Sequence, residues 1–242
     1  MPVLRGVSWE TGLVSAGPES LLSRRLYSFG EAARLLGLNA SKLRRWVDGA
    51  VVAGRRYEPV IRAASTGEPL LSWGEFVEAG FLREYRARGV SLQQLRPTIS
   101  ALRLRFDTEY PFATHPPFIG EGRRLVLEVQ QETGIDERLY VVVSRGVGQY
   151  VLSPVAEAFL DKVEFDPQWE IARRMRPLGA SSPVVIDPER SFGQPTVRGV
   201  RTETIAELFL ANESVSDIAE GYDLTEIEVQ AALRWELTDR AA

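Results

Sequence analysis

The sequence of 242 residues predicts a mostly helical α+β fold. Two kinds of pattern indicate it. Capping boxes, in which a Ser or Thr precedes a Glu or Gln by three positions, recur ahead of apolar residues at helical spacing. Short apolar runs bounded by glycine and proline have the length of strands. The helical patterns lie towards both ends of the chain, and the strand-like runs lie mainly in the middle.

We therefore divide the chain into four parts. They are an N-terminal arm (1–25), a winged helix-turn-helix unit (26–110), a strand-rich segment for linking or dimerisation (111–178) and a three-helix unit (179–242).

The charge is distributed unevenly between the two ends of the chain. Residues 1–110 carry 16 Lys and Arg against 11 Asp and Glu, a net charge of +5. Residues 177–242 carry 5 against 12, a net charge of -7. The overall charge of -4 thus averages a basic end suited to phosphate and an acidic end suited to a basic protein.

The composition excludes several classes of chemistry. The chain has no Cys and one His, so a disulfide framework, a zinc finger and a thiol nucleophile are excluded. No nucleophile–base pair is visible, so we expect no catalytic residue, no metal, no cofactor and no enzyme activity. The single His115 lies in a proline-bounded loop, where we expect it to be solvated.

The chain also lacks signals for a membrane. No segment approaches the ~20 apolar residues that span a bilayer. The first ten residues do not have the basic and then apolar pattern of a secretory signal. We expect a cytoplasmic protein that does not enter a membrane.

The first helical unit begins at a capping box formed by Ser28 and Glu31. The pattern predicts a helix that ends at Gly37, where glycine allows a left-handed cap. Asn39 then caps a second helix over 40–48. Two short capped helices joined by a tight turn are typical of a DNA-reading helix-turn-helix.

The second of these helices carries polar and cationic side chains on its predicted outer face. Base edges and phosphates require such donors. The candidate groove residues are Ser41, Lys42, Arg44 and Arg45. Short strands and turns over 51–71 would then form a wing, with phosphate-binding candidates Arg55, Arg56 and Arg62. The alternative interpretation is a solvated amphipathic helix.

Two further helices are predicted before residue 110. A capping box at Ser72 begins a helix that extends to about 88, and another at Ser91 begins one that extends to about 106. Pro97 either kinks the second helix or marks its true start.

The run from Tyr27 to Leu38, followed by Lys42-Leu43-Arg44-Arg45-Trp46, resembles the winged helix-turn-helix of MerR-type DNA-binding domains. The resemblance implies that the second helix enters the major groove and that the wing touches the DNA backbone. The long dimerising helix of that family is not evident, because Pro97 and Pro111 would interrupt it.

The middle segment predicts strands over 125–129, 139–143 and 149–152. A Gly-x-Gly at 146–148 is interpreted as a hairpin turn, because a strand follows it where a dinucleotide loop would need a helix. Ser153 and Pro154 begin a short helix.

The C-terminal unit predicts a strand over 183–186, an ordered loop and three helices. The helices cover about 203–211, 215–221 and 225–237. The residues expected to point inward are Ile205, Leu208, Phe209, Ile227, Ala231 and Leu233. The third helix carries Glu226, Glu228 and Glu236, so we expect its face to repel DNA and to suit a protein partner.

A second resemblance lies at Asp187-Pro188, Gly193-x-Pro195, Arg198-Gly199 and Arg201. These residues resemble the signature of a short bacterial domain of formerly unknown function, whose members are proposed antitoxins of PIN-like ribonuclease toxins. With the MerR-like reader, the chain resembles one subgroup of VapB antitoxins.

This resemblance gives a role to two arginines. Arg198 or Arg201 would cap the carboxylates that hold metal in the toxin, which implies a toxin-binding site. The alternative is that both arginines pin their own loop to Asp187 or Glu189.

The sequence therefore predicts an antitoxin that neutralises a PIN-like ribonuclease and binds operator DNA to repress its own operon. We expect a homodimer, because a palindromic operator matches a two-fold protein. The alternatives are a stand-alone MerR-like regulator that senses a small ligand in the middle segment, and an adaptor that no longer binds DNA.

Overall fold

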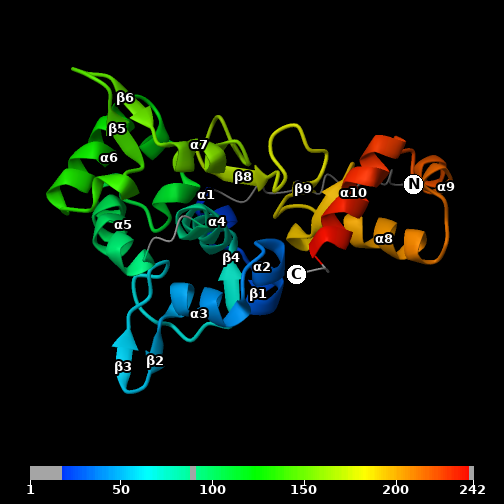
Figure 1. The fold of residues 1–242 in the computed structure, drawn as a ribbon, viewed down its shortest axis with the longest axis horizontal. Coiled ribbons are helices and arrows are strands. Elements are labelled where there is room, and N and C mark those ends of the chain that lie inside the picture. The colour runs from blue at the N-terminus through cyan, green and yellow to red at the C-terminus, as the bar shows by residue number, and fades with distance from the viewer. Residues whose placement is uncertain (1–17, 88–90, 240–242) are drawn as a thin grey trace, which may run out of the picture.

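The computed structural model describes residues 18–87 and 91–239 (Figure 1). It confirms the α+β class: helices are joined by one five-stranded antiparallel sheet and by two-stranded sheets in this part of the chain. The expected arm at 1–25 lies largely outside the described residues. Its last part forms helix α1 (Pro18–Ser23), which packs against α4 through buried Leu21 and Leu22.

The N-terminal elements follow the predicted order closely. They are β1 (Arg25–Ser28), α2 (Phe29–Leu35), α3 (Ala40–Asp48), β2 (Ala50–Val52), β3 (Arg55–Tyr57), β4 (Leu70–Ser72), α4 (Trp73–Ala87) and α5 (Leu92–Phe106). The capping box at Ser28 is formed: its hydroxyl accepts from the amide of Glu31, and the Glu31 carboxylate accepts from the amide of Ser28. Asn39 caps α3 as predicted.

One strand expected in the wing has a different partner. β4 pairs antiparallel with β1, so that Leu71 lies opposite Tyr27. Both side chains are fully buried. Because Leu71 is buried in the core, β4 lies beside β1 and not in the wing. The wing is therefore the β2–β3 hairpin alone.

Helix α4 lies at the centre of the molecule (Figure 1). Its largest buried side chains are Trp73, Phe76, Phe81 and Tyr85. The indole nitrogen of Trp73 donates to the carbonyl of Ala172, 2.7 Å away. Helix α4 thereby packs against both the N-terminal elements and the middle segment.

Helix α5 corrects one prediction and decides another. Pro97 lies inside the helix, which begins at Leu92. The Ser91 side chain makes no capping hydrogen bond, so the capping box predicted there is wrong. The amide of Gln94 instead binds the Ser91 carbonyl.

The strand predicted over 125–129 is also wrong, because these residues belong to helix α6 (Gly120–Glu132). Val126, Val129 and Gln130 are buried on one face at helical spacing. Arg124 on the exposed face pairs with the acidic residues three before and four after it, Glu121 and Glu128. The chain therefore buries a helical stripe here, where apolar content alone suggested a strand.

The rest of the middle segment is closer to expectation. The elements are η1 (Pro111–Ala113), η2 (Pro116–Phe118), η3 (Glu137–Leu139), β5 (Val142–Ser144), β6 (Tyr150–Leu152) and α7 (Pro154–Leu160). The β5–β6 hairpin and the Ser153 cap of α7 are confirmed. His115 is not simply solvated, because its ring stacks on Phe165 at 4.7 Å between centroids.

A single sheet crosses the expected boundary at 178. Its strands are β7 (Val163–Phe165), β8 (Ala172–Met175), β9 (Val185–Ile186), β10 (Pro195–Val197) and β11 (Val200–Arg201). Their order is β11-β10-β9-β8-β7, and Met175 of β8 pairs with Ile186 of β9. The middle and C-terminal parts therefore share one sheet.

Three helices complete the C-terminal end, as predicted: α8 (Thr202–Leu210), α9 (Val215–Gly221) and α10 (Glu226–Asp239). η4 (Ser191–Gly193) precedes β10. Phe209 and Ile227 were expected to point inward, but they are 38% and 71% exposed. Glu236 was expected on an exposed acidic face, but it is buried and accepts from the Thr202 hydroxyl at 2.6 Å. No helix in the described part of the chain is long and apolar enough to cross a membrane.

Candidate functional site

The exposed face of α3 carries all four candidate groove residues. Leu43, Trp46 and Val47 are buried against the rest of the unit. The residues between them, Ser41, Lys42, Arg44 and Arg45, are exposed. The amphipathic pattern thus places the cationic side chains outward, where a groove of DNA could meet them.

The β2–β3 hairpin follows α3 directly and projects away from the body of the molecule (Figure 1). Its two-residue turn consists of Ala53 and Gly54, both with positive φ, as a tight hairpin requires. Val51 pairs with Arg56 and Val52 with Arg55. Both arginines are exposed, so the structure brings them next to the helix in the arrangement of a helix-turn-helix with a short wing.

These cations are not neutralised by neighbouring carboxylates. Within the described residues, no Asp or Glu oxygen lies within 4.0 Å of the charged groups of Lys42, Arg44, Arg45, Arg55 or Arg56. The guanidinium of Arg44 lies 4.2 Å from the centroid of the Phe29 ring, and that of Arg55 lies 5.5 Å from the Tyr57 ring. Aromatic rings orient a guanidinium and leave its N–H donors available.

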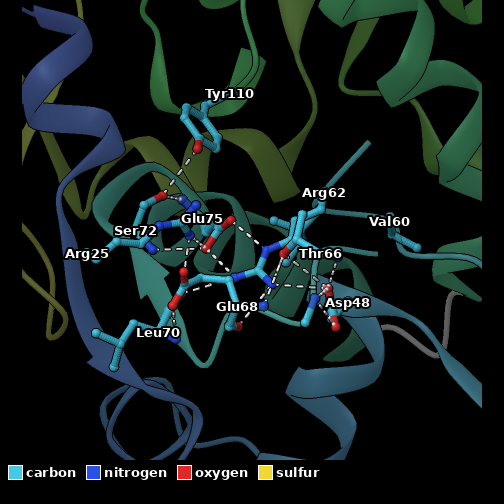
Figure 2. Close-up of polar contacts among 12 residues, drawn as sticks. Arg25, Asp48, Val60, Arg62, Thr66, Glu68, Leu70, Ser72, Glu75 and Tyr110 are labelled. Atoms are coloured by element: carbon cyan, nitrogen blue, oxygen red, sulfur yellow. Dashed lines mark hydrogen bonds and ion pairs between the residues drawn. The ribbon is translucent and has the colours of Figure 1, made fainter. Parts of the chain in front are cut away.

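Arg62, the third wing candidate, is not available to phosphate. Its side chain is only 5% exposed, and Figure 2 shows it among acidic and carbonyl oxygens. Nε donates to Glu75 Oε1 at 2.7 Å, and Nη1 donates to Asp48 Oδ1 at 3.1 Å. Because these carboxylates compensate for burial, the pKa of Arg62 is raised. The prediction that Arg62 contacts phosphate is therefore wrong.

Asp48 ends α3 and binds the segment that follows the hairpin. Its carboxylate accepts from the amides of Thr66 and Gly67 (Figure 2). Partial burial opposes ionisation of Asp48, but these amides and Arg62 outweigh it and hold its pKa below the ordinary value. A charged Asp48 therefore fastens the end of α3 to the chain beyond the hairpin.

Glu75 connects three segments through one buried carboxylate. It completes the capping box of α4, because Oε2 accepts from the Ser72 amide at 2.9 Å while its own amide binds the Ser72 hydroxyl. The same carboxylate binds Arg25 of β1 at 2.8 Å, as well as Arg62 (Figure 2). Sequence reasoning identified Glu75 as a helix cap, and its spacing gave no signal of the two long-range ion pairs.

The backbone beyond the hairpin returns to the C-terminal end of α3. The amides of Val60 and Ile61 both bind the Trp46 carbonyl, at 2.8 and 3.0 Å. Helix α5 then holds this segment, since Arg96 donates to the Pro59 carbonyl at 3.0 Å and Arg103 donates to the carbonyls of Val60 and Ile61. The two bonds to Trp46 satisfy a carbonyl that the end of α3 leaves unpaired, and the arginine bonds hold the chain that follows the hairpin against α5.

Of the two C-terminal candidates, Arg198 lies in the β10–β11 turn and Arg201 ends β11. Arg198 donates to the Asp223 carbonyl at 2.6 Å and lies 3.4 Å from the carboxylate of the same residue. Arg201 pairs with Glu203 at 3.2 Å. About half of each arginine side chain is exposed. In the alternative interpretation both arginines would pair with Asp187 or Glu189, but the structure pairs them with Asp223 and Glu203.

The structure also joins the two ends of the chain. The Tyr27 hydroxyl donates to the Gly193 carbonyl at 2.8 Å, in a buried contact. A Cβ on Gly193 would lie 2.2 Å from that hydroxyl. Arg34 of α2 lies 3.7 Å from the Glu236 carboxylate of α10. The helix-turn-helix is therefore packed on the C-terminal unit. The net charges of the two ends, read from the sequence, do not predict this contact. Among the described residues, no group of three potential ligands could hold a metal ion.

Comparison with known proteins gives matches over most of the chain. Residues 184–235 match a family described as a protein of unknown function, DUF433. A crystal structure of Rv2018 from Mycobacterium tuberculosis superposes with a TM-score of 0.70 at 26% identity, covering 86% of this chain and 97% of that one. A curated protein of the same organism named "Putative antitoxin VapB45" is 27% identical over 86% of this chain and 92% of its own length.

A second curated protein of M. tuberculosis, the uncharacterized protein Rv2308, is 32% identical. The match covers 88% of this chain and 91% of Rv2308. At this identity and coverage, the chain belongs to the same family as Rv2308.

Proposed function

We propose that the protein is an antitoxin that binds operator DNA through α3 and the β2–β3 hairpin and binds a PIN-like ribonuclease toxin through its C-terminal unit. In this proposal it acts as a homodimer, represses its own operon and has no enzymatic activity of its own. The relative named as an antitoxin supports the general role.

The observation that carries the DNA-binding part is the exposed cationic surface of α3 and the hairpin. Five cations lie there without an ion pair among the described residues: three are on α3, whose opposite face is buried, and two are on β3 of the hairpin. In contrast, Arg62, which follows the hairpin, is buried and forms ion pairs with Asp48 and Glu75. This separation between structural and free cations favours nucleic acid over a merely solvated helix.

The toxin-binding part rests on Arg198 and Arg201. Their present partners, Asp223 and Glu203, are exposed, so these ion pairs are worth only about 0–1 kcal/mol. A guanidinium held this weakly can be transferred to a buried cluster of carboxylates, where charge-assisted hydrogen bonds are stronger. Arg198 also has a positive φ of 49°, which presents its side chain from a tight turn.

The DNA-binding proposal is tested with the double variant Arg44→Ala plus Arg45→Ala. Binding to the DNA upstream of the gene is measured at several salt concentrations. We expect at least tenfold weaker binding and a smaller salt slope, because each arginine contributes about 1–3 kcal/mol. The matched control is Arg138→Ala plus Arg145→Ala, which removes two exposed charges from the middle segment. Equal binding by both double variants would refute the assignment.

The toxin-binding proposal is tested by co-expression with the product of the neighbouring open reading frame. We expect Arg198→Ala or Arg201→Ala to restore ribonuclease activity while the complex still co-purifies. Arg190→Ala is the control, because Arg190 is exposed on the same unit. Full neutralisation by both variants would show that neither arginine enters the toxin. If no complex forms with wild-type protein, the antitoxin assignment fails as a whole.

A further inference from the structure

A pocket of about 590 Å³ lies where the helix-turn-helix meets the C-terminal unit. Its walls come from the end of α2 and the following turn, from α4, from the loop between β8 and β9, and from α10. Its volume is within the range of sites for small molecules.

The polar groups of this pocket point to an anion. Its charged lining residues are Arg83 and Arg234, and no Asp or Glu lines it. Neither arginine has a carboxylate oxygen within 4.0 Å among the described residues. The indole N–H of Trp235, a side chain that is only 8% exposed, has no acceptor. Buried donors without acceptors are uncommon in proteins, so this set is suited to a ligand that supplies acceptors.

The remaining lining is apolar and partly exposed. Leu178 and Ile227 are 50% and 71% exposed, although aliphatic side chains gain free energy when they are buried. They belong to the β8–β9 loop and to α10, on either side of the pocket. A ligand with an apolar body would cover both side chains while its charged end reached the arginines.

We propose that this pocket binds a small carboxylate with an apolar body. The guanidinium groups of Arg83 and Arg234 would hold the carboxylate, since arginine matches its two oxygens with paired N–H donors. The apolar body would lie against Leu178, Ile227 and Leu35. This site is separate from the exposed surfaces of α3 and of the β10–β11 turn, and it also differs from the middle segment where the sequence suggested a ligand.

The position of the pocket couples it to the helix-turn-helix. The Arg83 guanidinium lies 3.6 Å from the place that a Cβ on Gly37 would occupy, so it touches the turn between α2 and α3. On the other side, Trp235 and Ala231 belong to α10. A bound carboxylate would therefore contact both units at once and favour the arrangement in which they are packed together.

The test uses three eight-carbon probes that share one apolar body: octanoate, octanamide and octylamine. Binding of each to the full-length protein is measured by isothermal titration calorimetry. We expect octanoate to bind and octylamine not to bind, with octanamide at least tenfold weaker than octanoate. Arg83→Gln and Arg234→Gln should each weaken octanoate binding about tenfold or more, because a hydrogen bond to a charged group contributes about 1.5–3 kcal/mol.

Arg145→Gln is the matched control, since Arg145 is exposed on the β5–β6 hairpin, away from the lining residues. Circular dichroism of each variant verifies folding, and Ser181→Phe provides a second variant that narrows the pocket without removing a charge. Equal binding of the three probes, or octanoate binding that no pocket variant weakens, would overturn the proposal. Because these measurements contain neither DNA nor toxin, their outcome does not depend on the proposed antitoxin function.

Discussion

Burial of the Glu78 carboxyl on α4 predicts a pH-dependent stability. Glu78 is fully buried, and its Oε1 accepts from the Phe112 amide at 2.6 Å while Oε2 has no partner. Desolvation raises the pKa of Glu78 to about 7, from an ordinary value of 4.5, although Arg103 and the amide oppose the shift. The folded protein therefore binds this proton more tightly than the unfolded chain does.

The sign and magnitude follow from linkage. Between pH 4.5 and about 7 the folded state holds the proton and the unfolded state has released it, so stability falls as the pH rises. A shift of this size corresponds to about 3 kcal/mol of unfolding free energy. Below pH 4.5 and above pH 7 the contribution of Glu78 is constant.

Replacement by an uncharged isostere isolates this contribution. As the pH rises from 4.5 to 8, we expect the unfolding free energy of Glu78→Gln to increase by about 3 kcal/mol relative to that of the wild type. The reason is that Gln keeps an acceptor for the Phe112 amide and carries no charge. Urea unfolding at a series of pH values measures the difference. Glu213→Gln, at an exposed position, is the control. A difference between Glu78→Gln and wild type that stays constant across this range would refute the reasoning.

Two further predictions concern the base of the wing. Arg62→Met removes a buried cation, so that Asp48 loses its ion pair and Glu75 keeps only the pair with Arg25. We expect a loss of about 3 kcal/mol in the free energy of urea unfolding, whereas Arg56→Met should change it by less than about 0.5 kcal/mol. Equal effects would show that the buried network contributes nothing. Gly49→Ala should destabilise the protein more than Gly54→Ala. Both glycines have φ near +75°, so the backbone strain is the same. Only at position 49 would the added Cβ also lie 2.6 Å from a backbone carbonyl of the hairpin. Equal unfolding free energies for these two alanine variants would rule out the steric explanation.

Local patterns predicted most helix starts. Ser28, Asn39 and Ser153 all cap helices as expected, because a cap is a hydrogen bond between residues that lie two or three positions apart. The failure at Ser91 has the same local spacing, and there the hydroxyl simply makes no such bond. The spacing was therefore a good guide to where helices begin and a weaker guide to each individual bond.

Short apolar runs that fit either a strand or a helix are harder to interpret. Residues 125–129 are rich in aliphatic side chains, which favoured a strand, yet they lie inside α6. The signal that could have identified the helix is charge spacing, since Glu121, Arg124 and Glu128 fall three and four residues apart. Apolar content alone does not distinguish the two structures in a short run.

The sequence by itself determined the α+β class, the two capped helices with their outward cations, and the three C-terminal helices, because these depend on neighbours a few residues away. Only the tertiary structure decided which arginines are free. Arg55, Arg56 and Arg62 look alike in the sequence, but Arg62 meets Asp48 and Glu75 and is buried. Long-range packing also brought the α2–α3 turn against α10, which created the Arg83–Arg234 pocket. Such contacts join residues far apart along the chain, so no local pattern specifies them.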